Sequence, residues 1–411
     1  MSFAGSNALH IKQHNLRAVL QNLLHKGPLS RVQLARQTAL SNTTITNLTG
    51  ELLELEIIRE EEPLSGQNGH KPRGVGRPRR MLHLVPNARY VVGIHIGIGI
   101  LRVAITNLYA EVQHNKIDSF AVDDPAAAVL DLIAQLVEQT IAEAGVDRAL
   151  IMGVGVGASG LVDPHTGVNV LAARLGWQDV PIRAYLEARL DLPVCVDNNV
   201  RAMALGEAVF GAGQGVNLLA FIYGRVGVGA GIVLNGQVFR GAGAGAGEIG
   251  HMIILPEAGE QCGCGQYGCL ETLVSEGVLV REAQTVVAQQ PHGRLAYHWQ
   301  QPDARPIEAI FAAAREGDAA TLHLIERRAH YLGIALANLV NVLNPELIIL
   351  GGMFAQGSDL ILPTAEATMR DAAFADLGKK VSLRPTSFGW RAGIIGASAV
   401  ALTQFFYEAA L

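Results

Sequence analysis

The sequence predicts an α/β protein in which a small basic helix-turn-helix module precedes a larger α/β module. Three observations predict this arrangement. The first 90 residues carry 12 Lys and Arg against 6 Asp and Glu, whereas the whole chain of 411 residues has a net charge of −5. Within those residues, apolar positions recur at helical spacing on either side of a tight turn. From Tyr90 onwards, short apolar segments containing glycine alternate with helical segments, as expected of an α/β fold.

The composition is that of a soluble globular protein. Apolar residues make up 49% and charged residues 17% of the chain, which excludes intrinsic disorder for most of it. No segment has the ~18 consecutive apolar residues that a membrane-spanning helix needs, so we expect a cytoplasmic protein with no membrane partner. The charge asymmetry predicts a polyanion as the partner of the first module and a neutral or internal ligand for the second.

Three helices are predicted within the first 55 residues. The first covers residues 9–25, and Ser30 caps a second over residues 31–37. The residues of the second helix that can face the first are Val32, Leu34 and Ala35. After a turn at residues 38–40, Ser41 caps the third helix. The residues that this third helix would bury are Ile45, Leu48, Leu52 and Leu55. This spacing is typical of a helix-turn-helix.

The N-terminal end of the third helix would present short polar side chains and no acid to solvent. These residues are Ser41, Asn42, Thr43, Thr44, Thr46 and Asn47. Because the second helix of a helix-turn-helix reads base edges in the major groove, we expect them to contact a double-stranded DNA operator.

A wing is predicted after the third helix, with strands over residues 57–61 and 80–85 around a tip rich in Gly and Pro. The basic residues of the tip are Lys71, Arg73, Arg77, Arg79 and Arg80. The slim segment Gly76-Arg77-Pro78 could place an arginine in a narrow minor groove, although a solvated basic loop is the alternative. We therefore assign residues 1–88 to a winged helix-turn-helix DNA-binding domain and residues 89–411 to the second module.

The second module alternates predicted strands and helices. Strands are expected over residues 91–96, 101–106, 150–156, 194–196, 218–222, 231–234 and 347–350. Helices are expected over residues 126–144, 182–190, 200–210 and 319–343. Glycine-rich segments occur at residues 97–100, 153–157 and 227–231, and each is either a phosphate loop or a tight turn between buried strands.

One histidine and three of the four cysteines have the spacing of a metal site. The motif is His251-x10-Cys262-x-Cys264-x4-Cys269, and the remaining cysteine is Cys195. Three thiolates and one imidazole fill the tetrahedral coordination of Zn²⁺ and leave no position for an activated water. The sequence therefore predicts a structural zinc ion. The alternative is that free cysteines cluster by chance.

Two glutamates lie close to this motif in the sequence. Glu248 lies three residues before His251, and Glu271 lies two residues after Cys269. A metal that fixes the imidazole would hold these side chains together as a rim suited to the hydroxyl groups of a sugar. Either glutamate alone would be an ordinary surface charge.

Several segments resemble the ROK family, which is named for repressors, open reading frames and kinases. The resemblance runs from about residue 10 to the end. The segments that carry it are GAGAGAGEIGHM at 241–252, EQCGCGQYGCLET at 260–272, ALGE at 204–207, NVLNPELIILGG at 341–352 and RAGIIGASAVAL near the C-terminus. The resemblance implies a two-lobed, actin-like (ribonuclease H-like) sugar-kinase fold with a ligand between the lobes.

The family pattern also implies domain limits and an assembly state. The first lobe would comprise about residues 89–200 with the C-terminal helix, and the second about residues 201–390 with the zinc knuckle at 251–269. A helix-turn-helix that reads a palindromic site acts as a dimer, so we expect a homodimer or tetramer.

The resemblance assigns a monosaccharide site. The family's sugar contacts fall on Asn198, Glu248, His251 and Glu271, and its zinc ligands fall on His251, Cys262, Cys264 and Cys269. Ser159 and Gly160 match a loop that approaches the sugar from the other lobe. Arg174 and Gln178 are further candidate neighbours.

Two departures from the family's kinases predict that the protein is not an enzyme. The carboxylate that accepts a proton from the sugar hydroxyl is replaced by Asn199, unless Asp197 takes its place through an altered loop. A positioned general base contributes roughly 10²- to 10⁴-fold in rate. The first phosphate loop reads HIGIGI at residues 95–100 and lacks the acid, threonine and lysine of the kinases. We expect no catalytic residue.

Three functions remain to be compared. The first is a sugar-responsive regulator, most simply a repressor of genes for sugar uptake or catabolism. The second is a sugar kinase with a fused DNA-binding domain. The third is a regulator controlled by a protein partner at the zinc region.

Overall fold

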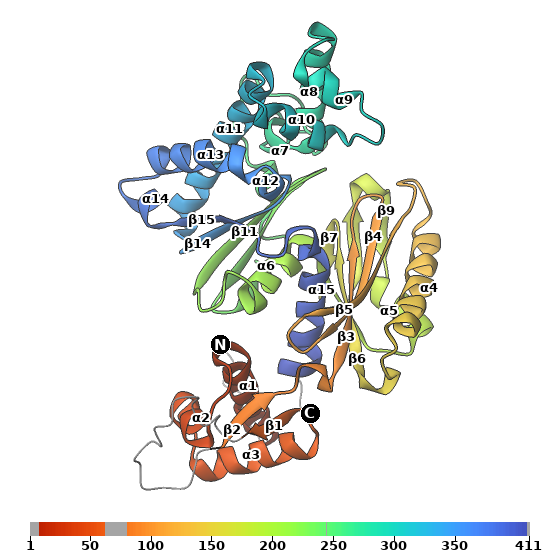
Figure 1. Cartoon of the computed structure of the whole chain (residues 1–411), viewed down its shortest axis with the longest axis vertical. Helices are drawn as coiled ribbons and strands as arrows, with labels where there is room; N and C mark the ends of the chain where they lie inside the picture. Colours follow the sequence, from red (N-terminus) through yellow and green to blue (C-terminus); the bar gives the residue numbers. More distant parts are fainter. Residues whose placement is uncertain (1–7, 62–79, 244, 409–411) are drawn as a thin grey trace, which may run out of the picture.

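The computed structural model describes residues 8–61, 80–243 and 245–408. The wing tip, with Lys71, Arg73, Arg77 and Arg79, lies outside these residues. Three bodies are visible along the long axis of the molecule: the N-terminal helices, a first lobe and a second lobe (Figure 1). Within the described part of the chain, no helix has both the length and the apolar character needed to cross a membrane.

The N-terminal region has the three helices and two strands that the sequence predicts. They are α1 (Ala8–Lys26), α2 (Arg31–Thr38), α3 (Asn42–Glu54), β1 (Ile58–Glu61) and β2 (Met81–Leu84). Ser30 and Gln33 form a reciprocal capping box at α2, and the Ser41 side chain accepts a hydrogen bond from the Thr44 N–H at α3. Ala39 ends α2 in the left-handed region with φ of 55°, which produces the tight turn.

Two predicted burials in this region are wrong. Val32 and Leu55 are both 42% exposed. Val32 lies about 200° around α2 from the buried Leu34, so it points away from the core. Leu55 lies after the end of α3, so the helical spacing that predicted its burial does not apply to it. Thr49 is fully buried on α3 instead, where its hydroxyl accepts a hydrogen bond from the Arg31 Nε at 3.0 Å.

The first lobe is built on a five-stranded sheet of order β10-β6-β3-β4-β5. Its strands are β3 (Tyr90–Ile96), β4 (Ile100–Asn107), β5 (Val112–Ser119), β6 (Ile151–Ala158) and β10 (Val194–Asn198). The helices α4 (Ala126–Ala144) and α5 (Ile182–Leu190) cover its outer face (Figure 1). A small side sheet contains β7 (Leu161–Asp163), β8 (Val168–Ala172) and β9 (Trp177–Val180).

The second lobe repeats this topology. Its sheet has the order β13-β12-β11-β14-β15, in which three antiparallel strands are followed by two parallel ones, as in the first lobe. The strands are β11 (Leu218–Gly224), β12 (Val228–Leu234), β13 (Gln237–Phe239), β14 (Leu347–Gly352) and β15 (Ser382–Pro385). This duplication confirms the two-lobed, actin-like fold class.

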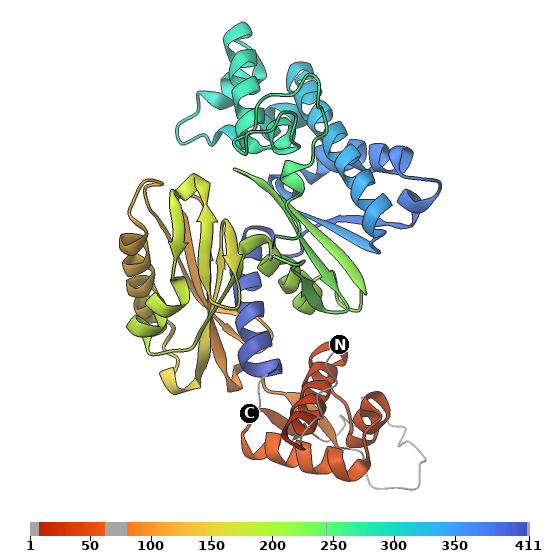
Figure 2. The ribbon, with the colours of Figure 1, turned by 180° about the vertical axis from the view of Figure 1, so that it is seen from behind.

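Helices complete the second lobe and join it to the first. The helices on its outer side are α7 (Glu271–Val274), α8 (Glu276–Gln289), α9 (Arg294–Trp299), α10 (Pro306–Arg315), α11 (Ala319–Leu343), α12 (Met353–Gln356), α13 (Ser358–Ala372) and α14 (Leu377–Lys380). Two helices, α6 (Asn199–Phe210) and α15 (Ala392–Leu402), lie between the two sheets. Figures 1 and 2 show this arrangement from opposite sides.

Two glycine-rich segments allow close packing of helices on strands. A Cβ on Gly155 of β6 would lie 2.0 Å from the Ala397 carbonyl oxygen of α15, and one on Gly231 of β12 would lie 2.5 Å from the Ala204 Cβ of α6. Residues 153–157 lie within β6, so they are neither a phosphate loop nor a tight turn, and both interpretations are wrong. The same holds for residues 228–231, which lie in β12. Residues 97–100 do contain the β3–β4 turn, in which Gly99 has φ of 69°.

The N-terminal region docks on the C-terminal end of the last helix. Leu16, Val19 and Leu20 of α1 belong to the same buried cluster as Phe406 and Tyr407, which lie in a π-helical turn after α15. An ion pair of 2.9 Å between Arg17 and Glu408 lies beside this contact. The position of the N-terminal helices is thus tied directly to the end of α15.

The packing of α15 on β6 predicts a large effect of a small substitution. Gly155→Ala would push its methyl group into the backbone of α15, so we expect a loss of about 1–3 kcal/mol in unfolding free energy and a lower thermal midpoint. Gly277→Ala is the matched control, because Gly277 lies in α8 with open space around it. Equal midpoints for the two variants, measured by circular dichroism, would contradict the close packing.

Candidate functional site

The candidate DNA-contacting residues lie together at the N-terminal end of α3. The side chains of Asn42, Thr43, Thr46 and Asn47 are exposed, and Thr44 is half-buried beside the capping hydroxyl of Ser41. The apolar side of the same helix is held against the core by Ile45, Leu48 and Leu52. The polar face is therefore presented by a rigid element, as major-groove recognition requires.

Four of the candidate sugar residues meet where α6 begins. Asn198 caps α6, because its side-chain oxygen accepts hydrogen bonds from the Val200 and Arg201 N–H groups. Its amide nitrogen donates to the Gly160 carbonyl at 2.9 Å. The Asn199 amide donates to the Ser159 hydroxyl at 3.0 Å. These bonds hold the 159–160 loop against the N-terminal end of α6.

Asp197 forms ion pairs with two arginines. Its carboxylate is 1% exposed and lies 2.8 Å from the Arg201 Nε and 2.6 Å from an Arg240 terminal nitrogen. Both oxygens of this buried carboxylate are thus already engaged by guanidinium groups. The structure thus gives no support to Asp197 as a substitute for the base that Asn199 replaces.

Glu271 reaches the first lobe. One of its oxygens accepts a hydrogen bond from the Val228 N–H at 3.1 Å. The other forms an ion pair of 2.8 Å with Arg174, which comes from the 3₁₀ turn Ala173–Leu175 of the first lobe. The sequence named Arg174 only as a neighbour, and no local pattern indicates a pair separated by 97 residues.

Glu248 and Gln178 have few contacts in the described chain. Both side chains are exposed, and neither has a hydrogen bond or ion pair with another described side chain. Glu248 immediately precedes the 3₁₀ turn Ile249–His251. Leu270 donates its N–H to the Met252 carbonyl at 2.8 Å, so the Glu248–His251 segment lies beside the start of α7, where Glu271 is found.

His251, Cys262, Cys264 and Cys269 converge on one point. Their ligand atoms all lie within 4.8 Å of one another. The His251 Nδ1 is 3.7 Å from the Cys262 Sγ, and the Cys264 and Cys269 sulfurs are also 3.7 Å apart. Sulfur ligands at ~2.3 Å around a tetrahedral zinc ion would lie about 3.8 Å apart. The four residues therefore form a cluster that could hold a metal ion, and its dimensions fit zinc.

The local structure explains this convergence. The Cys262 N–H bonds the Gln266 carbonyl at 2.7 Å, and Gly265 turns the chain with φ of 91°. The backbone N–H of Gln266 lowers the pKa of the Cys264 thiol to about 7, whereas burial raises the pKa of the Cys269 thiol to about 12. Binding of a cation would favour the thiolate form of both.

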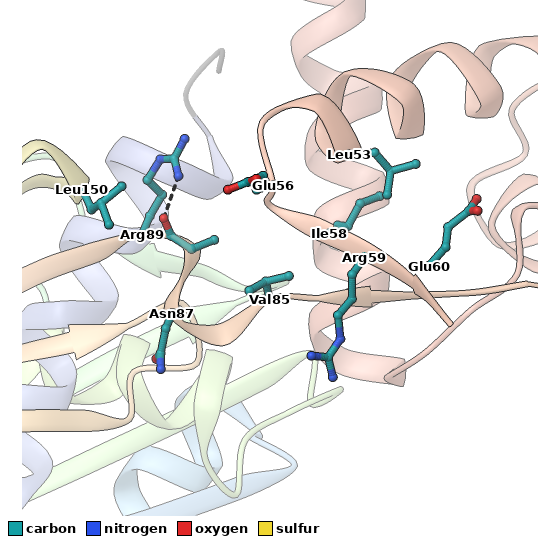
Figure 3. A pocket seen from close by; sticks show the side chains of 10 residues that line it. Leu53, Glu56, Ile58, Arg59, Glu60, Val85, Asn87, Arg89 and Leu150 are labelled. Carbon is teal, nitrogen blue, oxygen red and sulfur yellow. Dashed lines mark hydrogen bonds between the residues drawn. The ribbon is translucent and has the colours of Figure 1, made fainter. Parts of the chain in front are cut away.

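A separate hollow of about 470 Å³ lies where the N-terminal region meets the first lobe. Figure 3 shows side chains from α3, β1 and the segment after β2 around it. Its lining residues are Leu53, Glu56, Ile58, Arg59, Glu60, Val85, Asn87, Ala88, Arg89 and Leu150. None of them is a candidate sugar residue, so this hollow marks a junction between domains and not the predicted cleft.

Residues 91–404 match the family described as the ROK family. The chain belongs to the ROK family. It is 29% identical over 394 residues to a xylose repressor of Caldicellulosiruptor bescii, with 96% of each chain covered. Its fold matches that of a ROK family transcriptional regulator, a homologue of the Escherichia coli MLC protein, with a TM-score of 0.81, 29% identity and 97% of each chain covered.

The ROK kinases match a smaller part of the chain. A ROK family glucokinase from Streptomyces griseus, solved with glucose and AMPPNP, has a TM-score of 0.68 and 28% identity. The match covers 99% of the glucokinase but only 76% of this chain. The regulators alone among these relatives match nearly the full length, as expected if the N-terminal helices distinguish regulator from kinase.

The metal cluster can be tested without any functional assay. We expect purified protein to hold one tightly bound metal ion per chain, and Cys264→Ala to lose it because one of the four ligands is removed. Cys195→Ala is the control, since Cys195 is a buried cysteine of β10 outside the cluster. The measurement is metal content by mass spectrometry, and an unchanged content in Cys264→Ala would contradict the site.

Proposed function

We propose that the chain is a sugar-responsive transcriptional repressor. Residues 1–88 bind an operator as a homodimer or tetramer, and a monosaccharide held by residues 89–411 controls that binding. The observation that carries this proposal is the extent of similarity. A protein named as a xylose repressor and one named as a transcriptional regulator match 96% and 97% of the chain, whereas the glucokinase match covers 76% of it.

The DNA-binding part of the proposal rests on α3. Its exposed Asn and Thr side chains have the hydrogen-bonding groups that read base edges. Arg80, immediately before β2, pairs with Glu60 at 2.9 Å. We assign the phosphate contacts of the wing to Arg73, Arg77 and Arg79 from the sequence alone.

The sugar would lie between the lobes. Glu248, His251 and Glu271 supply acceptors and donors from the second lobe, and Asn198 with the 159–160 loop supplies them from the first. Arg174 occupies one oxygen of Glu271, so a sugar hydroxyl at Glu271 would displace or share this ion pair. Because the pair joins the lobes, a ligand there can change their disposition. A coupling of about 1–3 kcal/mol, or roughly 5- to 150-fold in affinity, is typical of such regulation.

Three features favour regulation over phosphoryl transfer. Asn199 cannot accept a proton, and its amide is bonded to Ser159. Asp197 is paired with two guanidinium groups. His95 stands where the family's kinases have the acid of the first phosphate loop. We further propose that the metal is zinc with a structural role, in which His251 binds through Nδ1 and keeps Nε2 toward the ligand.

Operator binding should separate base contacts from phosphate contacts. Asn47→Ala should weaken binding by about 5- to 150-fold with little change in salt dependence, because a base contact carries about 1–3 kcal/mol. Arg77→Ala should weaken binding and reduce the salt slope by about 1. The control is Arg370→Ala in α13, whose partner is Glu366 in the same helix. Fluorescence anisotropy with upstream DNA at several salt concentrations is the measurement. Wild-type affinity for Asn47→Ala would remove α3 from the interface.

The sugar site can be tested through Glu248. A sugar at 100 times its dissociation constant should stabilise the protein by about 2.7 kcal/mol. Glu248→Ala should abolish this stabilisation and leave operator affinity unchanged, because the side chain is exposed and supports no described contact. The measurement is thermal shift with xylose, glucose and other neutral sugars. A shift that survives the substitution would contradict this placement, and activity in a coupled ATP assay would favour the kinase alternative.

A further inference from the structure

The loop formed by Ser159 and Gly160 is bonded to three neighbouring elements. The Ser159 N–H donates to the carbonyl of Ile96, the last residue of β3, at 3.0 Å. The Ser159 carbonyl accepts a hydrogen bond of 2.9 Å from the side-chain amide of Asn169 on β8. The Gly160 carbonyl accepts one of 2.9 Å from Asn198, which caps α6. The backbone of the loop is therefore held from both sheets of the first lobe and from the helix between the lobes.

The Ser159 hydroxyl is also bonded, both as a donor and as an acceptor. A serine hydroxyl has one hydrogen to donate and an oxygen that accepts. Its hydrogen goes to the Ile96 carbonyl at 3.1 Å, and its oxygen accepts from the Asn199 amide nitrogen at 3.0 Å. Of the polar groups of Ser159 and Gly160, only the Gly160 N–H has no hydrogen bond in the described part of the chain. The loop can therefore offer this N–H to a ligand, whereas the Ser159 hydroxyl is already engaged.

The direction of these bonds requires an amide at residue 199. Because Ser159 gives its hydrogen to Ile96, a further partner of its oxygen has to be a donor. The Asn199 amide is a donor, whereas an ionised carboxylate of nearly the same size only accepts. A carboxylate here would compete with Ile96 for the Ser159 hydrogen. Asn199 is 7% exposed, so water cannot readily replace the bond that would be lost.

The surrounding residues keep the Asn199 amide in place. A Cβ on Gly157 would lie 3.3 Å from the Asn199 Cα, so the first residue of α6 packs closely on β6. The helix is fixed at this end because the Asn198 side chain caps it. A rigid element therefore presents the amide to Ser159.

Asn169 supports the same loop from the side sheet. Its side chain is fully buried, and its one described side-chain hydrogen bond is the bond to the Ser159 carbonyl. The Asn169 Oδ1 has no partner among the described residues. An apolar residue at this buried position would avoid the cost of an unpaired acceptor. The bond to Ser159 therefore explains why an asparagine is found here.

We propose that Asn199 is a positioning residue, which holds the 159–160 loop in place for sugar binding by donating to the Ser159 hydroxyl, and that it acts on the sugar only through this loop. The inference rests on the proposed function and specifies how one side of the sugar site is held. It gives the amide a purpose at the position where the family's kinases have a carboxylate. Residue 199 binds the loop here, and the loop binds the ligand.

The first test examines the loop without any ligand. In Asn199→Asp, amide hydrogen exchange at residues 156–162 of the full-length protein should be about tenfold faster, because a buried hydrogen bond of Ser159 is lost. The exchange of α4 should not change. Asn338→Asp is the matched control, since Asn338 is exposed on α11 and has no described side-chain bond. Wild-type exchange at residues 156–162 in Asn199→Asp would overturn the inference.

The second test is a double-mutant cycle on sugar affinity, measured by isothermal titration with xylose and with glucose. Asn199→Asp should weaken binding by about tenfold or more, and Ser159→Ala by a similar factor. In the Ser159→Ala background, Asn199→Asp should cost less than about twofold further, because the bond has already been removed. Equal losses in both backgrounds would show that Asn199 touches the sugar and would overturn the positioning role. Unchanged affinity with a lower unfolding temperature would also overturn it, because the role would then be structural alone.

Operator binding by the same preparations distinguishes this inference from the proposed function. Operator binding that xylose or glucose controls equally in the wild type and in Asn199→Asp would overturn the inference and leave the proposed function intact. A wild-type protein that binds no neutral sugar, although Asn199→Asp shows the faster exchange, would contradict the proposed function. It would also overturn the role of Asn199 in sugar binding, and only the attachment of the loop would remain.

Discussion

The structure depends on the contact between α6 and α15, in which backbone meets backbone. A Cβ on Gly396 of α15 would lie 2.6 Å from the backbone of Ala202 in α6, and one on Gly206 of α6 would lie 3.1 Å from Gly396. Each helix also packs on the sheet of one lobe. Because interiors are close-packed, the two lobes can change their angle only about this crossing or by repacking it. The pivot and the candidate site are adjacent, since α6 begins at Asn199.

The ionic contacts between the lobes are arranged around that pivot. Asp197 joins Arg201 of α6 to Arg240 near the end of β13, and these contacts are buried or half-buried. Arg174 and Glu271 meet farther out, and the Arg174 side chain is 53% exposed. A half-exposed pair is worth little because water competes for it. The outer pair is thus the one that costs least to break, while the inner pairs keep the lobes attached.

Local chemistry allowed much of the fold to be predicted. Ser30, Ser41 and Asp318 cap the helices that the sequence places after them, and Asn344 ends α11 in the left-handed region. The bounds of α4, α5 and α11 agree with the predictions to the residue. The His and Cys spacing likewise located a cluster that the structure brings within ligand distance. In each of these cases, the residues that determine the structure are close in sequence or are spaced at the period of one helix.

The failures have a common physical origin. Val32 and Leu55 are apolar at positions where tertiary packing, which the local pattern does not contain, decides exposure. Helices that are distant in sequence approach Gly155 and Gly231 closely, and this packing explains the glycines. The sequence pattern alone indicates loops instead. The Arg174–Glu271 pair depends on two lobes meeting. The assignments of individual DNA and sugar contacts remain predictions.

The docking of α1 on the turn after α15 also bears on how the chain folds. Arg17 and Glu408 are neighbours in space although almost the whole sequence separates them, and Leu20 shares a cluster with Phe406. During synthesis, the N-terminal helices leave the ribosome long before the residues they pack against exist. The apolar side chains of α1 that contact the C-terminal turn therefore lack these partners until both lobes have been synthesised. The docking of the N-terminal helices on the C-terminal turn can therefore be completed only after both lobes have been made.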